Sequence, residues 1–320
     1  MAYETGTALD ATDLLDKMRG FLLNNGWNQN LWGNIDSIQR LHMNKGDMYI
    51  NFRSSNNGEQ FWSHHICNEN YKGIAFYLST GFNSNLLWHE QPGGIDVQSY
   101  YSLFSNVNSV TGIVGSLAPV YSYYFFKNNK EEYLFIAETD PNVFRSMYFG
   151  KNSVLKDGED TLWLESGTGV LGGGVNINNT LFSADFYIRT INPRSASSHT
   201  NIRYNGEWFS NLGHNNHFSD IKKIICPMPA SSSTSVHLNS GGFLSSFCDI
   251  PFDQSPFILY PLMFGIEESP YYYPITTIEL VKSINYGSYT PAQEITLAGN
   301  TWMVFPNNSS PLGLAVKKTV

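Results

Sequence analysis

Two short segments carry the residue types that bind transition metals. Imidazole and thiolate groups are the ligands that zinc favours. They occur close together as His64, His65 and Cys67, and again as His214, His217 and Cys226. Neither group has the four-ligand spacing of a structural zinc site. We therefore expect polar loops whose imidazoles bond to solvent or to the backbone, and we assign no metal ligands.

A glycine-rich segment contains the G-x-G-x-x-G pattern of dinucleotide-binding loops, formed by Gly167, Gly169 and Gly172. That pattern holds a pyrophosphate where it leads from a strand into a helix, whose first amide groups bind the phosphate. The segment does follow a strand-like sequence at 160–166, but the next residues, GGVNINNT, have no helical period. We expect a flexible loop between strands and no cofactor.

Carboxylates beside an aromatic residue raise the question of glycoside hydrolysis. Glu159, Asp160 and Glu165 lie around Trp163, and a glycosidase needs two acids that face each other roughly 5 to 10 Å apart. Sequence spacing does not define that separation, and acids beside strands are usually solvated. The chain also has no G-x-S-x-G, H-E-x-x-H or protein-kinase motif. We predict that the protein is not an enzyme and assign no catalytic residues.

Aromatic residues make up 15% of the chain and gather in a few places. Tyr and Trp give a large contact area at low entropic cost, which favours protein interfaces and sugar sites. The stretch 271–273 lies between two prolines, so we expect a constrained loop or a sheet edge there. The candidate interface or glycan-binding residues are Trp208, Phe209, Tyr271, Tyr272 and Tyr273.

A second aromatic cluster lies in one strand-like segment and consists of Tyr121, Tyr123, Tyr124, Phe125 and Phe126. Successive residues of a strand face opposite sides of the sheet, so these rings cannot all enter one core. Either some of them form an interface, or the strand is buried on both faces within a β-sandwich.

The surface around these residues must carry little charge. Of the 320 residues, 14% are charged, where soluble proteins average roughly 25%. Such a neutral polar surface, rich in Asn and Ser, suits packing or adhesion. The net charge of −8 without a basic cluster argues against a nucleic-acid partner.

The compartment is also constrained by composition. No apolar run is long enough to span a bilayer and the N-terminus has no signal-peptide pattern, so we expect neither membrane insertion nor secretion. Three cysteines, Cys67, Cys226 and Cys248, form no disulfide framework, so we expect buried thiols in a reducing cytoplasm.

Residues 10–26 predict the one clear helix, of about four turns. Asp10 can cap its N-terminus with Asp13 in the first turn, and the Asn-Asn-Gly sequence at 24–26 tolerates the conformation that ends a helix. This amphipathic helix must dock on the protein's own β core or on a neighbouring subunit. Its apolar stripe consists of Leu14, Met18, Phe21 and Leu22.

After the helix the hydrophobic period changes to two, which predicts antiparallel β-structure. The segments with this pattern are 47–54, 72–80, 120–126, 132–139, 160–166, 181–190, 275–280 and 300–306. We expect a tight hairpin in which Asn128 and Asn129 take positive φ values, and a second turn at 298–300. The predicted fold class is mainly β: one or more antiparallel β-sandwiches with one N-terminal amphipathic α-helix.

The expected organisation has three parts. Residues 1–26 form an N-terminal segment with the docking helix, and residues 27–155 form a β domain. Residues 156–320 are either a second β domain or a continuation of the first with long loops, because GTGVLGGG and PMPASSSTS read as loops.

The N-terminal sequence AYETGTALDATDLLDKMRGFLLNNGW resembles the N-terminus of a family of tailed-bacteriophage virion structural proteins. In that family a T-G-T/S-A segment leads into a D-L-L/x-K-L/M-R-x-F-L helix that ends at G-W. Residues 120–151 are similar to that family's hairpin with a Y-x-G segment, and residues 294–307 to its C-terminal hairpin. Together these stretches cover roughly a quarter of the chain; residues 155–270 resemble nothing known.

The resemblance implies a structural component of a phage particle, made in the host cytoplasm and located in the virion, in the tail or baseplate. Its partners would be other virion proteins and copies of itself. We expect the helix, with Tyr3 to Thr7, to be the assembly contact, so that deletion of residues 1–26 leaves a soluble β domain. Two alternatives remain: recognition of a host-surface glycan, and decoration of the capsid.

Overall fold

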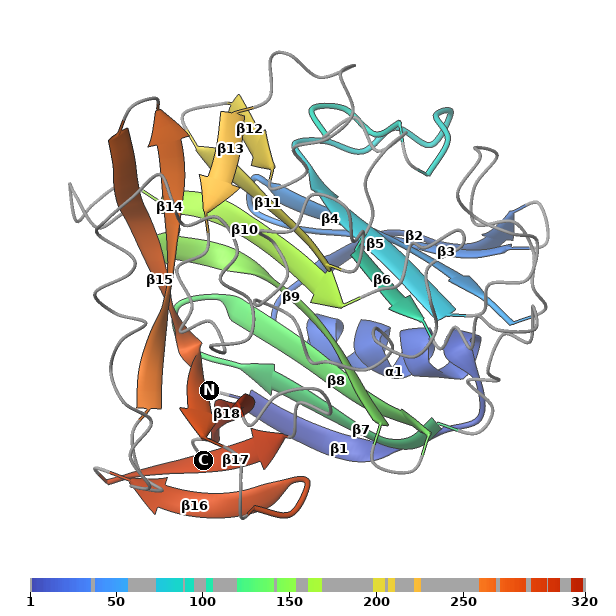
Figure 1. Cartoon of the computed structure of the whole chain (residues 1–320). Coiled ribbons are helices and arrows are strands. Elements are labelled where there is room, and N and C mark those ends of the chain that lie inside the picture. Colours follow the sequence, from blue (N-terminus) through green and yellow to red (C-terminus); the bar gives the residue numbers. More distant parts are fainter. Residues whose placement is uncertain are drawn as a thin grey trace, which may run out of the picture.

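The computed structural model describes residues 2–35, 38–56, 73–88, 90–94, 102–105, 120–140, 143–153, 161–168, 198–204, 207–210, 222–225, 259–268, 271–285, 289–297, 299–305 and 312–318. This part of the chain is mainly β, with a 13-stranded sheet, a 5-stranded sheet and one α-helix. The fold class is therefore the one that the sequence predicts. Figure 1 shows the helix lying between the small sheet and the first strands of the large sheet.

The small sheet is antiparallel and follows the chain order. Alternate residues of its middle strands are apolar and buried, as in a sheet with one face on a core. Its first two strands were not predicted, because NQNLWGNI and IQRLHMNK contain few β-branched residues. The strands are β2 (Asn28–Ile35), β3 (Ile38–Lys45), β4 (Met48–Ser55), β5 (Gly73–Ser79) and β6 (Ser102–Ser105).

The large sheet begins with the N-terminal strand and ends with the C-terminal hairpin. Its neighbouring strands are antiparallel except for the parallel pair β12–β13. In spatial order they are β1 (Ala2–Ala8), β7 (Val120–Lys127), β8 (Glu132–Asp140), β9 (Val143–Ser153), β10 (Thr161–Thr168), β11 (Ser198–Tyr204), β12 (Glu207–Ser210), β13 (Lys222–Ile225), β14 (Leu259–Glu268), β15 (Tyr271–Asn285), β18 (Leu312–Lys318), β17 (Asn300–Phe305) and β16 (Gln293–Leu297).

This order bears on how the chain is divided. β9 pairs with β10 from Met147–Gly167 to Ser153–Thr161, on either side of residue 155. The large sheet therefore runs without a break across the expected boundary. The predicted strand at 181–190 lies outside the described residues.

The helix α1 (Ala11–Asn24) begins and ends as the sequence predicts. The Asp10 carboxylate accepts the backbone N–H of Asp13 at 2.8 Å, and the Asp13 carboxylate accepts the N–H of Leu9 at 2.9 Å. The first bond satisfies an amide group that the first helical turn leaves without a partner, and the second fixes the residue before the N-cap. After the helix, Gly26 adopts φ +83°, a conformation that glycine takes at low cost.

The apolar stripe of α1 faces the protein's own core. Leu14, Met18, Phe21 and Leu22 are at most 3% exposed, and the Phe21 ring lies 5.6 Å from Phe125 of β7, centroid to centroid. Side chains buried this deeply cannot touch a neighbouring subunit, so the interpretation of these four residues as an assembly contact is wrong. Of the two docking partners left open by the sequence, the β core is the one found.

The N-terminal residues before the helix are also part of the fold. Tyr3 to Thr7 lie in β1, which pairs with β7 over Ala2–Lys127 to Ala8–Val120. The Thr5 hydroxyl donates to the Tyr123 carbonyl oxygen at 2.7 Å. The segment 1–26 thus supplies both an edge strand and part of the main core. This placement argues against the expectation that its deletion leaves a folded β domain.

The strand β7 is buried on both faces, the alternative that the aromatic cluster left open. Tyr123 and Phe125 join the core beneath α1. On the opposite face, the ring centroids of Tyr124 and Phe126 lie 5.1 and 6.2 Å from that of Phe305 in β17. The large sheet therefore bends until its last strands cover the outer face of its first ones.

The two expected turns have different outcomes. The turn between β16 and β17 is confirmed, with Gly299 at φ +74°. The β7–β8 hairpin is also present, but Asn128 and Asn129 do not take positive φ values; the left-handed residue is Glu131, at φ +61°. The Asn128 N–H bonds to the Glu132 carbonyl oxygen at 3.1 Å, which shows that the loop is longer than a two-residue turn.

The burial of the helix stripe predicts a large loss of stability on truncation. Phe21→Ala should lower the free energy of unfolding by about 3–5 kcal/mol, because it removes ring contacts with Phe125 and Phe135. Leu23→Ala, at an exposed position of the same helix, is the matched control and should change it by less than about 1 kcal/mol. Urea unfolding followed by circular dichroism measures both; equal effects would contradict the placement of the helix.

Candidate functional site

The residue types suited to metal binding lie mostly beyond what the structure describes. His64, His65, Cys67, His214, His217, Cys226 and Cys248 are all outside the described residues. Within the described ranges, no three His, Cys, Asp or Glu residues are grouped so as to hold a metal ion.

The glycine pattern and the carboxylates are partly described. Gly167 lies in β10, opposite Met147 of β9 and His199 of β11. Glu165 lies in the same strand, two residues from Trp163, whereas Gly169, Gly172, Glu159 and Asp160 are outside the described residues. The first glycine of the pattern is therefore a ladder residue in the middle of a sheet.

The five candidate aromatics occupy strands. Trp208 and Phe209 lie in β12, and residues 271–273 lie in β15 rather than in a loop, opposite 266–268 of β14. Residues directly opposite in a ladder share a face, and the register leads from Ser210 through Lys223 and Glu267 to Tyr272. Positions 208 and 272 therefore share one face, and positions 209, 271 and 273 the other.

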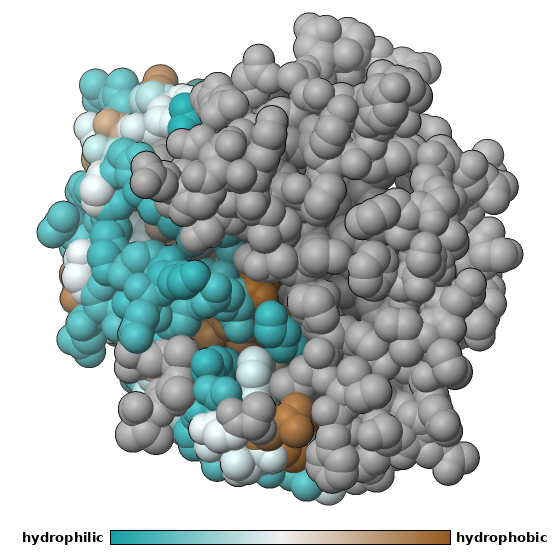
Figure 2. Space-filling model, turned by 90° about the vertical axis from the view of Figure 1, so that its left-hand side faces the viewer, coloured by the Kyte–Doolittle hydropathy of each residue, from teal (hydrophilic) through white to brown (hydrophobic). Residues whose placement is uncertain are grey.

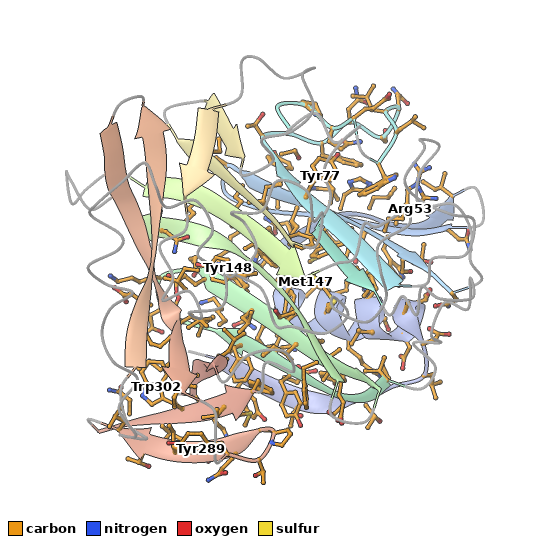
Figure 3. The ribbon with its side chains drawn as sticks, in the orientation of Figure 1. Arg53, Tyr77, Met147, Tyr148, Tyr289 and Trp302 are labelled. Carbon is orange, nitrogen blue, oxygen red and sulfur yellow. The ribbon has the colours of Figure 1, made fainter. Side chains whose placement is uncertain are left out.

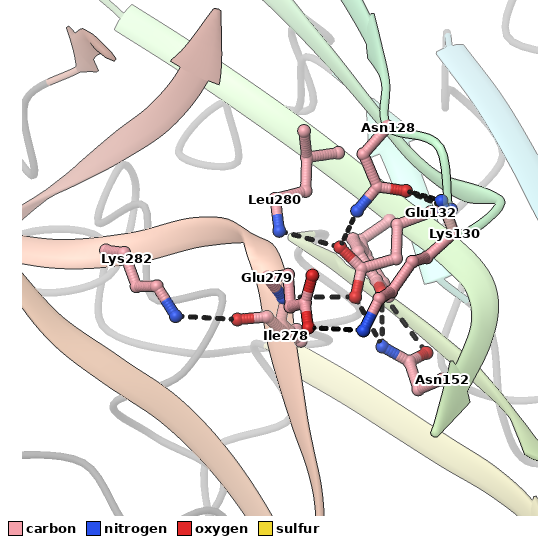
Figure 4. Close-up of polar contacts among 9 residues, drawn as sticks. Asn128, Lys130, Glu132, Asn152, Ile278, Glu279, Leu280 and Lys282 are labelled. Atoms are coloured by element: carbon pink, nitrogen blue, oxygen red, sulfur yellow. Dashed lines mark hydrogen bonds and ion pairs between the residues drawn. The ribbon is translucent and has the colours of Figure 1, made fainter. Parts of the chain in front are cut away.

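The best-defined polar cluster in the described residues surrounds the loop between β7 and β8 (Figure 4). Asn128 organises the loop: its side-chain oxygen accepts the backbone N–H groups of Lys130 and Glu132 at 2.9 and 3.0 Å. Its amide group then donates to the Glu132 carboxylate at 2.6 Å. One asparagine thus shapes the loop and orients the acid that follows it.

The carboxylate of Glu132 joins three strands of the large sheet. It is 1% exposed, and besides Asn128 it accepts the Asn152 amide of β9 at 2.8 Å. From β15 it accepts the backbone N–H groups of Glu279 at 3.0 Å and Leu280 at 2.6 Å. Four donors from three segments saturate both oxygens, which is what a buried acid requires.

Burial has a clear effect on the titration of this cluster. Desolvation raises the pKa of Glu132 to about 7, against the opposing effect of the Glu279 and Leu280 amides. Burial likewise raises the pKa of the Tyr148 hydroxyl, which is bonded to Asn152, and lowers the pKa of Lys282. The acid therefore changes its charge near neutral pH.

The preceding residue, Glu131, points to the other side of the loop. Its carboxylate accepts the Tyr133 hydroxyl at 2.5 Å and lies 2.7 Å from Lys45 Nζ and 3.1 Å from Lys127 Nζ. Burial alone would raise the pKa of Glu131, but the bonds from Lys45, Tyr133 and Lys127 outweigh it and the pKa is lowered. Lys45 also donates to the Asn25 carbonyl oxygen at 2.7 Å, at the end of α1.

The strand β9 makes two further contacts beside this loop. Lys151 of β9 pairs with Asp47 in the turn between β3 and β4. Gly150 lets β9 pass close to the loop, since a Cβ there would lie 2.8 Å from the Glu131 carbonyl oxygen. The small sheet, α1 and the large sheet therefore all meet at the β7–β8 loop.

A second polar row is buried on the outer face of the small sheet. His42 Nδ1 lies 2.6 Å from the Asn51 side-chain oxygen, and the Asn51 amide donates to Ser79 Oγ at 2.9 Å. The Ser79 hydroxyl donates onward to the Gly81 carbonyl oxygen at 2.9 Å. Burial lowers the pKa of His42 to about 4 and keeps it neutral. Because the serine proton is bound to a carbonyl, the row anchors a loop and does not activate a nucleophile.

That loop, 80–94, is held closed by its own polar groups. Gln91 accepts the backbone N–H of Asn83 at 2.7 Å and donates to the Leu87 carbonyl oxygen at 2.9 Å. Tyr77 of β5 donates its hydroxyl proton to the Trp88 carbonyl oxygen. Figure 3 shows Tyr77 and Arg53 on this side of the small sheet, far from Tyr148 and Trp302. The described residues of this loop cover the sheet, with Leu87 exposed.

Chemically, the Glu131–Glu132 cluster is a structural joint. Its buried acid has no open side through which a substrate can approach, and its four donors hold it in place. The cluster was not predicted from the sequence, although Asn128, Glu131 and Glu132 lie in the predicted hairpin. The signal was an acid at the start of a strand that otherwise has mainly apolar residues.

No protein-family model matches the chain, and a search of curated proteins finds no match either. None of the described helices is long and apolar enough to cross a membrane.

The raised pKa of Glu132 predicts a pH-dependent stability. The folded state binds a proton more tightly than the unfolded chain does, so the stabilisation is complete below about pH 4.5 and is lost as the pH rises through about 7. The free energy of unfolding should fall across that interval by at most about 3 kcal/mol. Chemical unfolding measured from pH 5 to about 8 tests this linkage.

Two variants assign that pH dependence. Glu132→Gln should remove this part of the slope, because an amide side chain does not titrate. It should also destabilise the protein at pH 8, where its NH₂ group replaces a carboxylate oxygen that accepts amide donors. Glu279→Gln, at an exposed acid bonded to Lys130, should keep most of the slope, because the Glu279 carboxylate raises the pKa of Glu132 less than burial does. An unchanged slope in Glu132→Gln would show that another group is responsible.

The left-handed conformation of Glu131 predicts different results for two substitutions. Glu131→Gly and Glu131→Gln both remove the carboxylate and its lysine contacts, but glycine adopts φ +61° more easily. Glu131→Gly should therefore be the more stable of the two by about 1 kcal/mol. Thermal unfolding at low and high salt measures the difference, and high salt should narrow the gap between each variant and the parent protein. A less stable glycine variant would contradict this account.

Proposed function

We propose that the protein is a structural component of a tailed-phage virion, present in several copies in the tail or baseplate. It acts by protein–protein assembly and carries out no reaction. Its partners are other virion proteins and further copies of the same chain.

The observation that carries this proposal concerns the N-terminal sequence with the phage resemblance. Its positions coincide with one complete structural unit: the edge strand β1, the Asp10 cap, the buried face of α1 and the left-handed Gly26. Trp27, which ends the motif, packs against Tyr133 and Phe149, with ring centroids 5.7 and 5.8 Å apart, respectively. Similarity at residues that determine the fold supports a shared fold more strongly than similarity at exposed residues does.

The character of the described surface agrees with an assembling protein of low charge. Figure 2 shows that the described part of one face is mainly hydrophilic, and hydrophobic residues reach it in small separate patches. Covering neutral polar groups removes few ions from water, so contacts cost little in desolvation. Repetition of weak contacts in a symmetric particle then gives a stable assembly.

The test is the location and copy number of the protein in purified particles of the virus that encodes it. We expect quantitative mass spectrometry to find several copies per particle, and immunogold labelling of the native protein to mark the tail or baseplate. Labelling of the head would favour capsid decoration. Absence from purified particles would overturn the proposal, and binding of the purified protein to host polysaccharide would favour glycan recognition.

A further inference from the structure

Three edge strands with described side chains are available for contact with another chain: β1 and β16 at the ends of the large sheet and β2 at one end of the small sheet. An open edge presents unpaired N–H and C=O groups, which readily pair with another strand. Because the apolar stripe of α1 is buried within the protein, these edges are the better candidates for an assembly contact. The edges differ in how well they can accept a partner.

Two of these edges carry irregularities that hinder pairing. The register of β1 shifts between Gly6 and Ala8, and that of β2 shifts between Gln29 and Leu31. Bulges of this kind twist an edge away from an incoming strand. By contrast, β16 pairs with β17 without a register shift from Gln293–Val304 to Leu297–Asn300. Its irregularity lies just before the strand, where Ala292, at φ +59°, donates its N–H to the Val304 carbonyl oxygen at 2.8 Å. Figure 1 shows β16 as an outermost strand of the molecule.

The side chains of β16 are divided between a core and the solvent. Ile295 belongs to a hydrophobic cluster with Trp302 and Val304, whereas Glu294 and Thr296 are exposed on the other face. The single charge of the strand, on Glu294, is paired with Lys318 of β18. The edge therefore lacks the unpaired charge that commonly protects an edge strand.

Hydrogen-bonding directions follow from the hairpin. Leu297 and Asn300 flank the turn and form a hydrogen-bonded pair, and so do Ile295 and Trp302, two residues further on. The backbone groups of Ile295 and Leu297 therefore point toward β17, and those of the residues between and before them point the other way. The N–H and C=O groups of Glu294 and Thr296 therefore point away from β17. These are the groups that a neighbouring strand would bind.

A second copy of β16 fits this edge in antiparallel register about Ile295. Each Glu294 then lies opposite Thr296 of the other copy, so no acid faces an acid, and Ile295 meets Ile295. Both Glu294–Thr296 pairs exchange N–H and C=O bonds, giving roughly four new backbone hydrogen bonds. The two hydrophobic clusters beneath the edges become continuous. The strand is thus self-complementary in charge, register and burial.

We propose that β16 is a self-association surface, through which two copies of this chain join their large sheets edge to edge about a two-fold axis. This inference rests on the proposed function as a multi-copy protein and names one of its contacts. The occupant of the edge is a second copy, and the contact is isologous.

A pair of opposite charges at one exposed position tests the register. Thr296→Glu places a second acid opposite Glu294 of the other copy, twice per dimer, and should weaken self-association roughly tenfold or more. Thr296→Lys places a base opposite the same acid and should preserve or strengthen it. Sedimentation velocity of the full chain over a range of concentrations measures the dimer, with thermal unfolding to show that both variants fold.

The results separate the contact from the function. A concentration-dependent dimer that Thr296→Glu weakens and Thr296→Lys retains supports the β16 contact. A parent protein that stays monomeric at all concentrations, or a dimer that both variants leave unchanged, overturns it. Neither of these results contradicts the presence of the protein in the particle. If the protein dimerises but is absent from purified particles, the proposed function is refuted and the edge contact still stands.

Discussion

The two adjacent acids of the β7–β8 loop hold the molecule together from opposite sides. Glu132 turns into the large sheet and binds backbone amides of β15, whereas Glu131 turns outward and binds Lys45 of the small sheet. Lys45 in turn holds the carbonyl end of α1. A single loop therefore sets the position of the N-terminal helix, the small sheet and the C-terminal strands. The left-handed backbone at Glu131 is strained for a residue with a Cβ, and three donors around its carboxylate maintain it.

A buried carboxylate is an expensive way to join strands, because desolvation opposes its charged form. Its advantage here is directional. The ladder between β14 and β15 shifts register between Pro261 and Leu262 and again between Phe264 and Gly265, so backbone pairing alone specifies β15 weakly. The amides of Glu279 and Leu280 fit Glu132 in one register, and a slip by one residue would also turn the buried side chains of β15 to the wrong face. We infer that the acid contributes to specifying the fold more than to stabilising it.

Local signals were readable in the sequence where one element alone determines them. The Asp10 cap, the helix stripe and Gly26 follow from helix geometry, and strong strands such as β7 and β8 follow from their alternating apolar residues. What the stripe contacts depends on other strands of the fold, some of them about a hundred residues away, such as β7 with Phe125. The sequence alone therefore could not distinguish the protein's own core from a neighbouring subunit. The Asn128–Glu132 cluster was missed for the same reason: its donors come from β9 and β15. The prediction of a positive φ at Asn128 was wrong: its side chain accepts two backbone N–H groups of the loop, and Glu131 takes the left-handed conformation.

The aromatic surplus of the chain acquires a different meaning once β7 is seen to be covered on both faces. Rings such as Tyr124 and Phe125 pack against opposite layers of the same protein, so in the described residues their abundance reflects a sheet folded back on itself. The large apolar side chains that remain exposed there, Leu9, Leu23 and Leu87, belong to separate segments. Each is a single side chain, whereas a stable interface usually needs a contiguous apolar area. On the proposal that copies of this chain assemble, association through these parts of the surface would draw on backbone pairing and repetition. Among the described strands, β16 suits that role because its one acid is paired with Lys318.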